Sequence, residues 1–328
     1  MLTIRQNLME TIRGGNPDRF VNQYEAFKLL FHPTMVTSPS PQYGELNVVN
    51  AWGITNSWPE GTPGRFPVHT PDKVVIKDIT KWRDYVHAPS VKFPDAVWEP
   101  FIKQSEEVDR NEYFVTPFIA PGVFEQCHHL GEIQQTLINF YEEPEHMHDL
   151  IDYLTDWECS LAEELCKHLK PDAIFHHDDW GSQISTFISP DMFEEFYLPA
   201  YKKIYGLYKS LGVELIVHHS DSYAATLVPY MIDMGIDIWQ GVMTTNNIPE
   251  LIKKYGGQIS FMGGIDSAKV DYEGWTREVI ASEVKRACDE NGKLYFIPNA
   301  SQGLSVSTFP GVYETISEEI EKYSKVVF

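Results

Sequence analysis

The sequence predicts an α/β protein with one domain over residues 1–328, a TIM-like (β/α)8 barrel. Two observations support this prediction. From about residue 111 onward, short apolar runs alternate with longer amphipathic stretches, which is typical of parallel strands joined by helices. Several apolar runs also end in polar residue types, as barrel strands do when their carboxyl ends share one active site.

The amino-terminal part, residues 1–75, is expected to pack on the barrel as a helix followed by an irregular insert. A helix is predicted over residues 3–13, because Gly14 and Gly15 provide a stop signal after it. Residues 33–72 are rich in Pro, Gly, Ser, Asn and Trp, so we expect hairpin and loop structure there instead of a solvated linker.

Beyond this insert, the alternation predicts a series of strands with helices between them. The expected strands are YFVTPFI, AIFHH, ELIVHH, IDIWQGV, ISFMGGI and LYFIPN, in chain order. The expected helices cover residues 132–169, 191–211, 223–234, 248–255, 273–291 and 310–325. The helix over 191–211 has the clearest pattern, since its apolar residues recur at helical spacing between Asp191 and Gly212.

Composition restricts the partners and the compartment. The chain has 26 basic and 47 acidic residues and a net charge of −21, which argues against nucleic acid and against an anionic membrane surface. It shows neither an apolar run of transmembrane length nor a signal peptide, so we expect a cytoplasmic protein. The four cysteines form no CxxC pair and are expected to be mostly buried thiols.

The run His176-His177-Asp178-Asp179 offers two imidazoles and two carboxylates at one strand end. Extended backbone sends successive side chains to opposite sides, so one His and one Asp are expected to face the barrel mouth. The other His and Asp would then be packed or bonded to backbone. The alternative for Asp178 or Asp179 is to cap a turn or a helix.

Two further candidates follow other strands. His219 and Asp221 are two residues apart, share a face in extended backbone, and offer ligands to a divalent metal such as zinc. Proton transfer, substrate binding and a structural hydrogen bond are the alternatives. Glu125 comes after a Pro-Gly turn and is interpreted as a buried base, a metal ligand or an exposed acid at a helix start. The absence of GxGxxG and GxxxxGK[ST] disfavours a nucleotide cofactor.

Aromatic residues are frequent in or beside the segments expected at the mouth. Core packing is the alternative for each of them, but together they would suit a flat or aromatic ligand. They are Trp52, Trp58, Phe118, Phe124, Trp180, Tyr223 and Trp239.

At these residues the chain resembles the uroporphyrinogen decarboxylase superfamily. The resemblance covers nearly the whole length, and its most specific part is DDWGSQ followed by SPDMFEEFYLP. It implies a TIM-like barrel with the active site in the cleft at the carboxyl ends of the strands. The strand and helix pattern leads to the same expectation independently.

The resemblance implies either a porphyrinogen decarboxylase or a zinc-dependent methyltransferase that exchanges methyl groups with a corrinoid protein. The decarboxylases carry an Arg-Gln-Ala-Gly-Arg-type motif, which the corresponding FVNQYEAFKLLFHP lacks. The methyltransferases show His-x-Cys after the fifth strand and a further Cys after the last strand. Here His219-Ser220-Asp221 and Pro298-Asn299-Ala300-Ser301 occupy these places, so the imidazole is kept and both thiolates are absent.

Loss of the thiolates favours activation of an oxygen leaving group over activation of a thiol. The resemblance therefore implies the methyltransferase component of an O-demethylase, which passes the methyl group of a small aromatic methyl ether to cobalt(I). A separate corrinoid (cobalamin) protein is the expected partner. The site contains a metal rebuilt from the residues present, or it has lost the metal and works by acid catalysis.

Residue roles follow from this interpretation. His219 and Asp221 would activate the ether oxygen, directly or through zinc held with Glu125 or with an Asp of 178–179. His177, Asp179 and Gln126 would hold or protonate that oxygen. The expected substrate-binding aromatic residues are Phe124, Trp180, Tyr223 and Trp239.

Two other functions stay open at this point. The first is a decarboxylase of a non-porphyrin carboxylic acid on the same scaffold, which needs a basic residue to hold the carboxylate. The second is a non-catalytic corrinoid or tetrapyrrole carrier, which the clustered His and Asp residues disfavour. The oligomeric state is also open, and a homodimer is one possibility.

Overall fold

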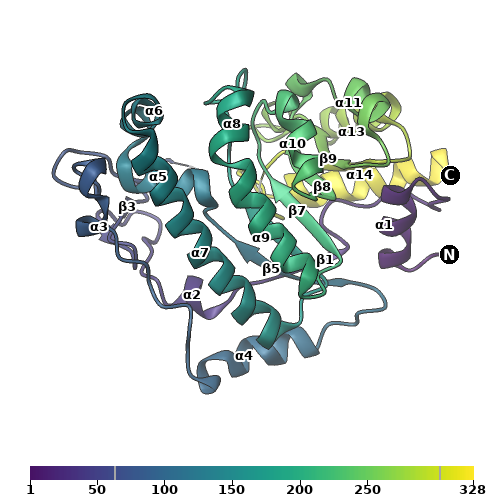
Figure 1. Ribbon diagram of the computed structural model, residues 1–328. Coiled ribbons are helices and arrows are strands. Elements are labelled where there is room, and N and C mark those ends of the chain that lie inside the picture. Colours follow the sequence, from purple (N-terminus) through teal and green to yellow (C-terminus); the bar gives the residue numbers. More distant parts are fainter. Residues whose placement is uncertain (63, 303) are drawn as a thin grey trace.

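A curled sheet of seven parallel strands forms the centre of the protein (Figure 1). The computed structural model describes every residue of the chain except 63 and 303. The strands lie in the order β1 (Phe27–Leu30), β5 (Phe114–Ile119), β6 (Ala173–His177), β7 (Leu215–His219), β8 (Ile238–Val242), β9 (Ser260–Ile265) and β10 (Phe296–Ala300). The predicted α/β fold is confirmed, whereas a full barrel of eight strands is not, since seven strands form this sheet in the described residues.

The two end strands of the sheet, β1 and β10, are connected through one residue that precedes β1. Gln23 has a φ of 51° and donates its backbone N–H to the carbonyl of Pro298 at 3.3 Å. Its side-chain oxygen accepts hydrogen bonds from the Asn299 side chain and the Ala300 backbone, both at 3.4 Å. Side-chain and backbone bonds of Gln23 thus span the seam that a strand ladder would close in a full barrel.

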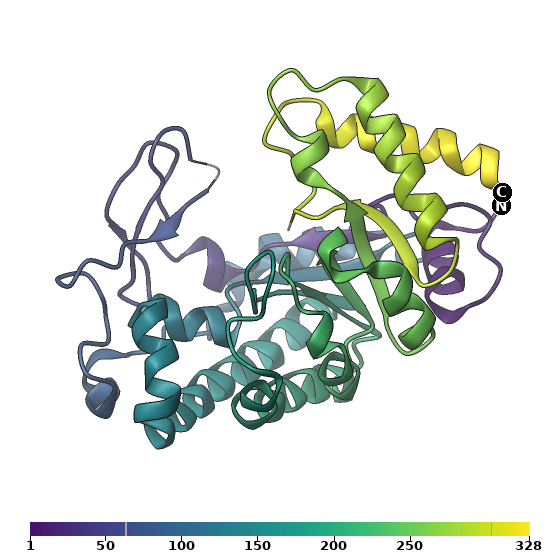
Figure 2. The same ribbon diagram turned by 90° about the horizontal axis from the view of Figure 1, so that it is seen from above.

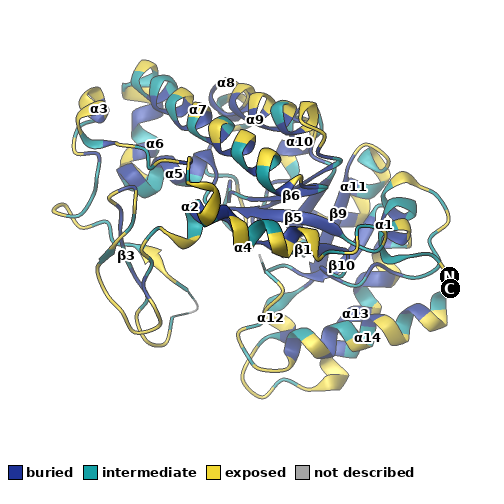
Figure 3. Cartoon of the chain, turned by 90° about the horizontal axis from the view of Figure 1, so that it is seen from below, coloured by how far each residue is buried: buried dark blue, intermediate teal, exposed yellow. Residues whose placement is uncertain are grey.

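Helices cover the outer face of the sheet, and Figure 3 shows the strands buried with exposed residues on the outer sides of the helices. The described part of the chain contains no helix whose length and apolar character would let it cross a membrane. The longer helices are α1 (Ile4–Arg13), α4 (Asp95–Glu106), α5 (Val123–Gly131), α6 (Ile133–Glu142), α7 (Pro144–Leu169), α8 (Pro190–Phe196), α9 (Leu198–Ser210), α10 (Val228–Asp233), α11 (Ile248–Tyr255), α13 (Arg277–Asn291) and α14 (Val312–Val327). The short helices are α2 (Pro33–Val36), α3 (Trp82–Tyr85) and α12 (Ser267–Val270).

The six predicted strands are confirmed as β5 to β10, but two predicted helices are each divided in two. The stretch 132–169 forms α6 and α7, and the second of these begins at Pro144. The stretch 191–211 forms α8 and α9, and Pro199 lies in the first turn of the second. Proline lacks the N–H that a continuing helix needs and is tolerated in a first turn, so each proline starts a new helix.

Residues 38–62 and 64–75 form an arm beside the curled sheet, and Figure 2 shows it at the opposite end of the molecule from α13 and α14. The arm contains an antiparallel sheet of β2 (Val48–Val49), β3 (Thr55–Ser57) and β4 (Phe66–Pro67), so the predicted hairpin and loop structure is confirmed. Trp52 attaches the arm to α7, since its ring packs edge-on against Trp157 with centroids 4.9 Å apart.

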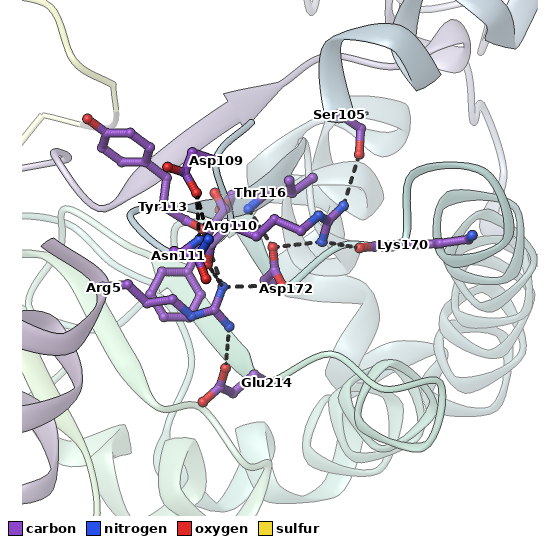
Figure 4. Close-up of polar contacts among 12 residues, drawn as sticks. Arg5, Ser105, Asp109, Arg110, Asn111, Tyr113, Thr116, Lys170, Asp172 and Glu214 are labelled. Carbon is purple, nitrogen blue, oxygen red and sulfur yellow. Dashed lines mark hydrogen bonds and ion pairs between the residues drawn. The ribbon is translucent and has the colours of Figure 1, made fainter. Parts of the chain in front are cut away.

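A network of charged residues ties α1 to the amino end of the sheet (Figure 4). Asp172, just before β6, accepts hydrogen bonds from Arg110 at 2.8 Å and from the backbone N–H of Val115 at 2.9 Å. Arg5 of α1 lies 3.3 Å from the same carboxylate and donates to Glu214 at 2.6 Å. These bonds connect the starts of three adjacent strands through one helix.

We expect Arg5→Ala to lower the free energy of unfolding by about 2 kcal/mol, the range for hydrogen bonds to charged groups. The side chain is largely shielded from water and also covers the Phe114 ring at 4.0 Å, so its loss removes packing as well as charge. Urea denaturation measures the effect. Arg13→Ala is the matched control, because Arg13 also pairs with Glu214 but is 67% exposed. Equal losses in the two variants would contradict the prediction.

Candidate active site

The carboxyl ends of the central strands place a layer of polar side chains inside the mouth of the curled sheet. His177 of β6 lies in register with His219 of β7, which lies in register with Gln240 of β8. Aligned residues on neighbouring strands point to the same face, so these three side chains form one row. Asn299 of β10 extends the row, since its side-chain oxygen accepts a hydrogen bond from Gln240 at 2.9 Å.

Aromatic rings form the floor beneath this polar row. Phe118 stacks on Phe175 with centroids 5.6 Å apart, and Tyr24 packs against Phe175 at 5.8 Å. Phe175 in turn stacks beneath the His219 ring at 6.1 Å. Of the floor residues, the sequence analysis named Phe118 only, although Phe175 precedes His177 by two residues and must share its face.

Three side chains at the mouth can hold a metal ion together. His177, Asp179 and His219 each offer a ligand atom, and these atoms all lie within 4.8 Å of one another. The Asp179 carboxylate is 3.8 Å from Nε2 of His219, and the rings of His177 and His219 stack at 4.3 Å. Imidazole nitrogen and carboxylate oxygen are both ligands of zinc.

This set differs from the predicted ligands His219, Asp221 and Glu125. Asp221 contacts the cluster through its backbone N–H, which donates to Asp179 at 3.0 Å. Glu125 accepts a hydrogen bond from Nδ1 of His177 at 2.9 Å. The structure therefore groups His219 with His177 and Asp179, while Glu125 contacts the far nitrogen of His177 and Asp221 is exposed beside Asp179. Strand β7 ends at His219, so the expectation that extended backbone places Asp221 on the same face is not met, while the metal ligands themselves stay a prediction.

Hydrogen bonding fixes which nitrogen of His219 is free. The Gln240 amide donates through Nε2 to Asn299 and to the carbonyl of Gln302 at 3.0 Å, so its oxygen is the atom facing His219. That oxygen lies 2.5 Å from Nδ1 of His219 and accepts its hydrogen. Burial, followed by repulsion from His177, lowers the pKa of His219 to about 4, so the ring is neutral. Its Nε2 lone pair is then available beside Asp179.

Gln240 is a positioning residue that the sequence analysis missed. We expect Gln240→Leu to weaken zinc binding by about 10- to 100-fold, the usual effect of losing a partner behind a ligating histidine. Gln240→Glu keeps the acceptor for Nδ1 and should retain wild-type affinity or exceed it. Competition with a chelating dye measures both. The same affinity in the Leu variant as in the wild type would show that His219 needs no such orientation.

His177 is the cationic group of the mouth. Burial alone lowers the pKa of His177, but ion pairing with Glu125, followed by attraction to Asp179, raises it to about 10. Enclosure by the surrounding protein, followed by repulsion from Asp179, raises the pKa of Asp221 to about 7, although its side chain keeps contact with solvent. The mouth therefore combines one imidazolium with several carboxyl groups that compete for protons.

The alternate residues of the same segment point behind the sheet. Asp178 is fully buried and accepts hydrogen bonds from the backbone N–H groups of Phe124 at 3.0 Å and Glu125 at 2.8 Å. It also accepts from Nε1 of Trp180 at 3.2 Å and from the hydroxyl of Tyr201. The hypothesis that Asp178 caps a helix is confirmed, since it caps the first turn of α5 and so positions Glu125.

A buried chain of hydrogen bonds lies in this rear layer. Nε2 of His176 is 3.0 Å from Glu158, and the Tyr205 hydroxyl is 2.8 Å from Nδ1 of both His176 and His218. The hydroxyl has one hydrogen, so it donates to one ring and accepts from the other. Nε2 of His218 is 3.1 Å from the carbonyl of Asp178 and must donate to it, so Tyr205 donates to His218 and accepts from His176. Glu158 and His176 then share a single further proton.

Three aromatic residues that were expected against the substrate lie in the core instead. Trp180 stacks on His218 at 3.9 Å behind the sheet. Trp239 points the same way and donates from Nε1 to the carbonyl of Ser220 at 2.9 Å, because it precedes the inward Gln240 by one residue. Phe124 is buried against Phe187, which precedes α8, and against Tyr197, which lies between α8 and α9. These three rings thus lie behind the sheet, whereas Phe118, Phe175 and Tyr24 are buried beneath the polar row.

Gln126 and Tyr223 are the two remaining substrate-binding candidates, and in the described part of the chain neither side chain forms a hydrogen bond with the mouth group of His177, Asp179 and His219. Gln126 is buried on α5, and its Nε2 has no hydrogen-bond partner in the described part of the chain. Tyr223 is half-buried, and its backbone N–H donates to the carbonyl of Ser182 at 2.7 Å. Their proposed contacts with substrate stay predictions.

Known proteins resemble this chain in sequence and in fold. The family profile described as uroporphyrinogen decarboxylase (URO-D) matches residues 127–323, which is more than half of the chain. A methyltransferase from Methanosarcina mazei superposes with a TM-score of 0.69 at 14% identity, covering 98% of this chain and 99% of that chain. A B12-independent methionine synthase from Shewanella sp. W3-18-1 has a TM-score of 0.48 at 14% identity, covering 75% and 72%. No curated protein sequence matches.

Proposed function

The chain belongs to the uroporphyrinogen decarboxylase family, and from this premise we propose that it is a methyltransferase that demethylates small aryl methyl ethers. The methyl acceptor would be the cobalt of a separate corrinoid protein. One observation carries the proposal: His177, Asp179 and His219 converge above an aromatic floor and include no thiolate. A nitrogen and oxygen donor set suits activation of an oxygen leaving group, and Phe118, edge-on to His177 at 6.4 Å, gives the site an aromatic neighbour for an aryl ring.

In the proposed reaction, the bond between the methyl carbon and the ether oxygen breaks, and cobalt(I) supplies the electron pair for the new bond to carbon. The aryl oxygen keeps the electron pair of the broken bond and takes up a proton. The chain must therefore stabilise developing negative charge on this oxygen. A protonated His177, held by Glu125 at 2.9 Å, can donate that proton directly.

The mouth also fits a zinc ion, because Nε2 of His219 carries a free lone pair beside Asp179. His177, Asp179 and His219 would hold the ion, which when bound supplies a Lewis acid for the ether oxygen. Gln240 and Glu125 would then orient the two histidines through their second nitrogens. Both forms of the site use the same residues.

Charge around the mouth favours an uncharged substrate. Glu125, Asp179 and Asp221 surround His177, and in the described part of the chain no Lys or Arg forms an ion pair with them. A carboxylate on the aryl ring would meet these acidic groups with no Lys or Arg beside it, while His177 is already paired with Glu125. We therefore expect guaiacol to be a better substrate than vanillate, which adds a carboxylate to a similar ring.

The test is methyl transfer to a reduced corrinoid protein, followed by its visible spectrum, with guaiacol and vanillate at equal concentrations. The expected result is methylation of cobalt that needs the protein and proceeds faster from guaiacol. Failure of every methoxyarene in a wider panel would overturn the proposal. Faster transfer from vanillate would overturn the charge argument alone.

A decarboxylase of a non-porphyrin carboxylic acid is the second candidate, because the matching family profile is described by that reaction. This function predicts release of carbon dioxide without any corrinoid protein. The acidic mouth argues against it, since a carboxylate substrate needs a cationic partner and the imidazolium of His177 is already paired with Glu125. Incubation with aromatic and aliphatic carboxylic acids, followed by carbon dioxide detection, separates the two functions.

A further inference from the structure

We propose a second divalent-cation site on α5, formed by Glu125, His128 and His129 and suited to zinc. It lies beside the mouth and is distinct from the group of His177, Asp179 and His219. The second site does not depend on the proposed methyl transfer, because its ligands come from one helix and a different set of side chains.

The spacing of the three residues brings their side chains together. Glu125, His128 and His129 occupy positions i, i+3 and i+4 of α5, which lie on one face of a helix. Their ligand atoms lie within 4.8 Å of one another. All three side chains are half-buried, so an ion can reach them and keep water as a further ligand.

The two imidazoles are free to bind an ion. Within the described residues, no hydrogen bond engages the ring nitrogens of His128 or His129, and the rings lie 4.8 Å apart, edge to face. Nε2 of His69, in the arm, lies 3.2 Å from the backbone carbonyl of His129, so this contact does not involve the His129 ring. Three histidines from two segments thus meet where the arm approaches α5.

Glu125 is a ligand of the second site only, but it also contacts the mouth group through His177. One oxygen of its carboxylate accepts the hydrogen bond from Nδ1 of His177 at 2.9 Å. A carboxylate has a second oxygen with its own lone pairs, so Glu125 can bind a cation while keeping His177 in place. An ion at this second site would offset the charge of Glu125 and fix the helix face that supports His177.

The experiment counts bound zinc in the full chain after removal of metal with a chelator and dialysis against micromolar zinc. We expect two ions per wild-type chain, one in the double variant His128→Ala/His129→Ala, and one in His219→Ala. The control His146→Ala removes a half-buried histidine near the start of α7 and should keep two ions.

The outcomes separate the two sites. Zinc binding by the double variant equal to that of the wild type overturns this proposal. If the wild type binds one ion that the double variant loses and His219→Ala keeps, the second site stands and the mouth binds no metal. If His219→Ala loses that ion and the double variant keeps it, this proposal fails while the mouth site stands.

A measurement on the wild type covers the case in which the double variant does not fold. Diethyl pyrocarbonate modifies free imidazoles, and mass spectrometry locates the modified residues. Zinc is expected to slow modification of His128 and His129 at least about 10-fold, as occupancy above 90% would require. Equal modification with and without zinc would overturn the proposal.

Discussion

Replacing His219 with alanine is expected to slow methyl transfer from an aryl ether at least about 100-fold, the lower range for losing a group that acts on the leaving atom. His219 is the central member of the polar row, and its Nε2 is the one lone pair that hydrogen bonding holds toward Asp179. Alanine removes this ligand, so zinc at the mouth should be lost as well. The measurements are kcat/KM with a corrinoid acceptor and the zinc content of the same samples.

The control for this prediction is His146→Ala, which should keep wild-type activity. A wild-type rate in His219→Ala would contradict the role of the polar row. The zinc content distinguishes the two forms of the mechanism. An active wild type without metal at the mouth would favour acid catalysis, and His177→Gln should then reduce kcat at least as much as His219→Ala.

Replacing Asp178 with alanine is expected to lower the free energy of unfolding by about 4 kcal/mol. The substitution leaves several buried donors without an acceptor, each costing about 1–3 kcal/mol before the structure relaxes. Two of these donors are the backbone N–H groups at the start of α5, so the helix that carries Glu125 loses its cap. Urea denaturation followed by circular dichroism measures the loss.

Tyr201→Phe provides a graded comparison, because it removes one donor of the same group and should cost about 1 kcal/mol. Asp191→Ala is the surface control, since Asp191 is an exposed acid on α8 and should change stability by less than about 0.5 kcal/mol. A small effect of Asp178→Ala, similar to that of Asp191→Ala, would show that water replaces the carboxylate without cost.

The alternation of apolar runs and amphipathic stretches was sufficient to predict β5 to β10 and the α/β class. It did not predict β1, because FKLL is short and its pairing depends on β5, which lies far along the sequence. The prediction of single helices over 132–169 and 191–211, where the structure has two each, has a different cause. The apolar periodicity of each stretch continues across Pro144 or Pro199. The prediction followed this periodicity and overlooked that each proline marks a helix boundary.

For the site, strand alternation correctly divided the four residues 176–179 into two faces, but it cannot tell which face is the mouth. The partner of His219 was not predictable from local sequence, since Gln240 reaches it through the register of β7 and β8. Trp239 illustrates the opposite error. Trp239 was expected among the substrate-binding aromatic residues, yet its neighbour Gln240 takes the inward position.

The paired histidines at the ends of β6 and β7 also bear on how the chain chooses its strand register during folding. Both strands are apolar on both faces, so slipping by one residue would still bury hydrophobic side chains and would still present an imidazole at the mouth. A slipped strand would lose its bonds to Glu158 and Tyr205 in the rear layer. The hydrogen bonds behind the sheet therefore stabilise the register in which His177 and His219 face the mouth and His176 and His218 face the rear layer.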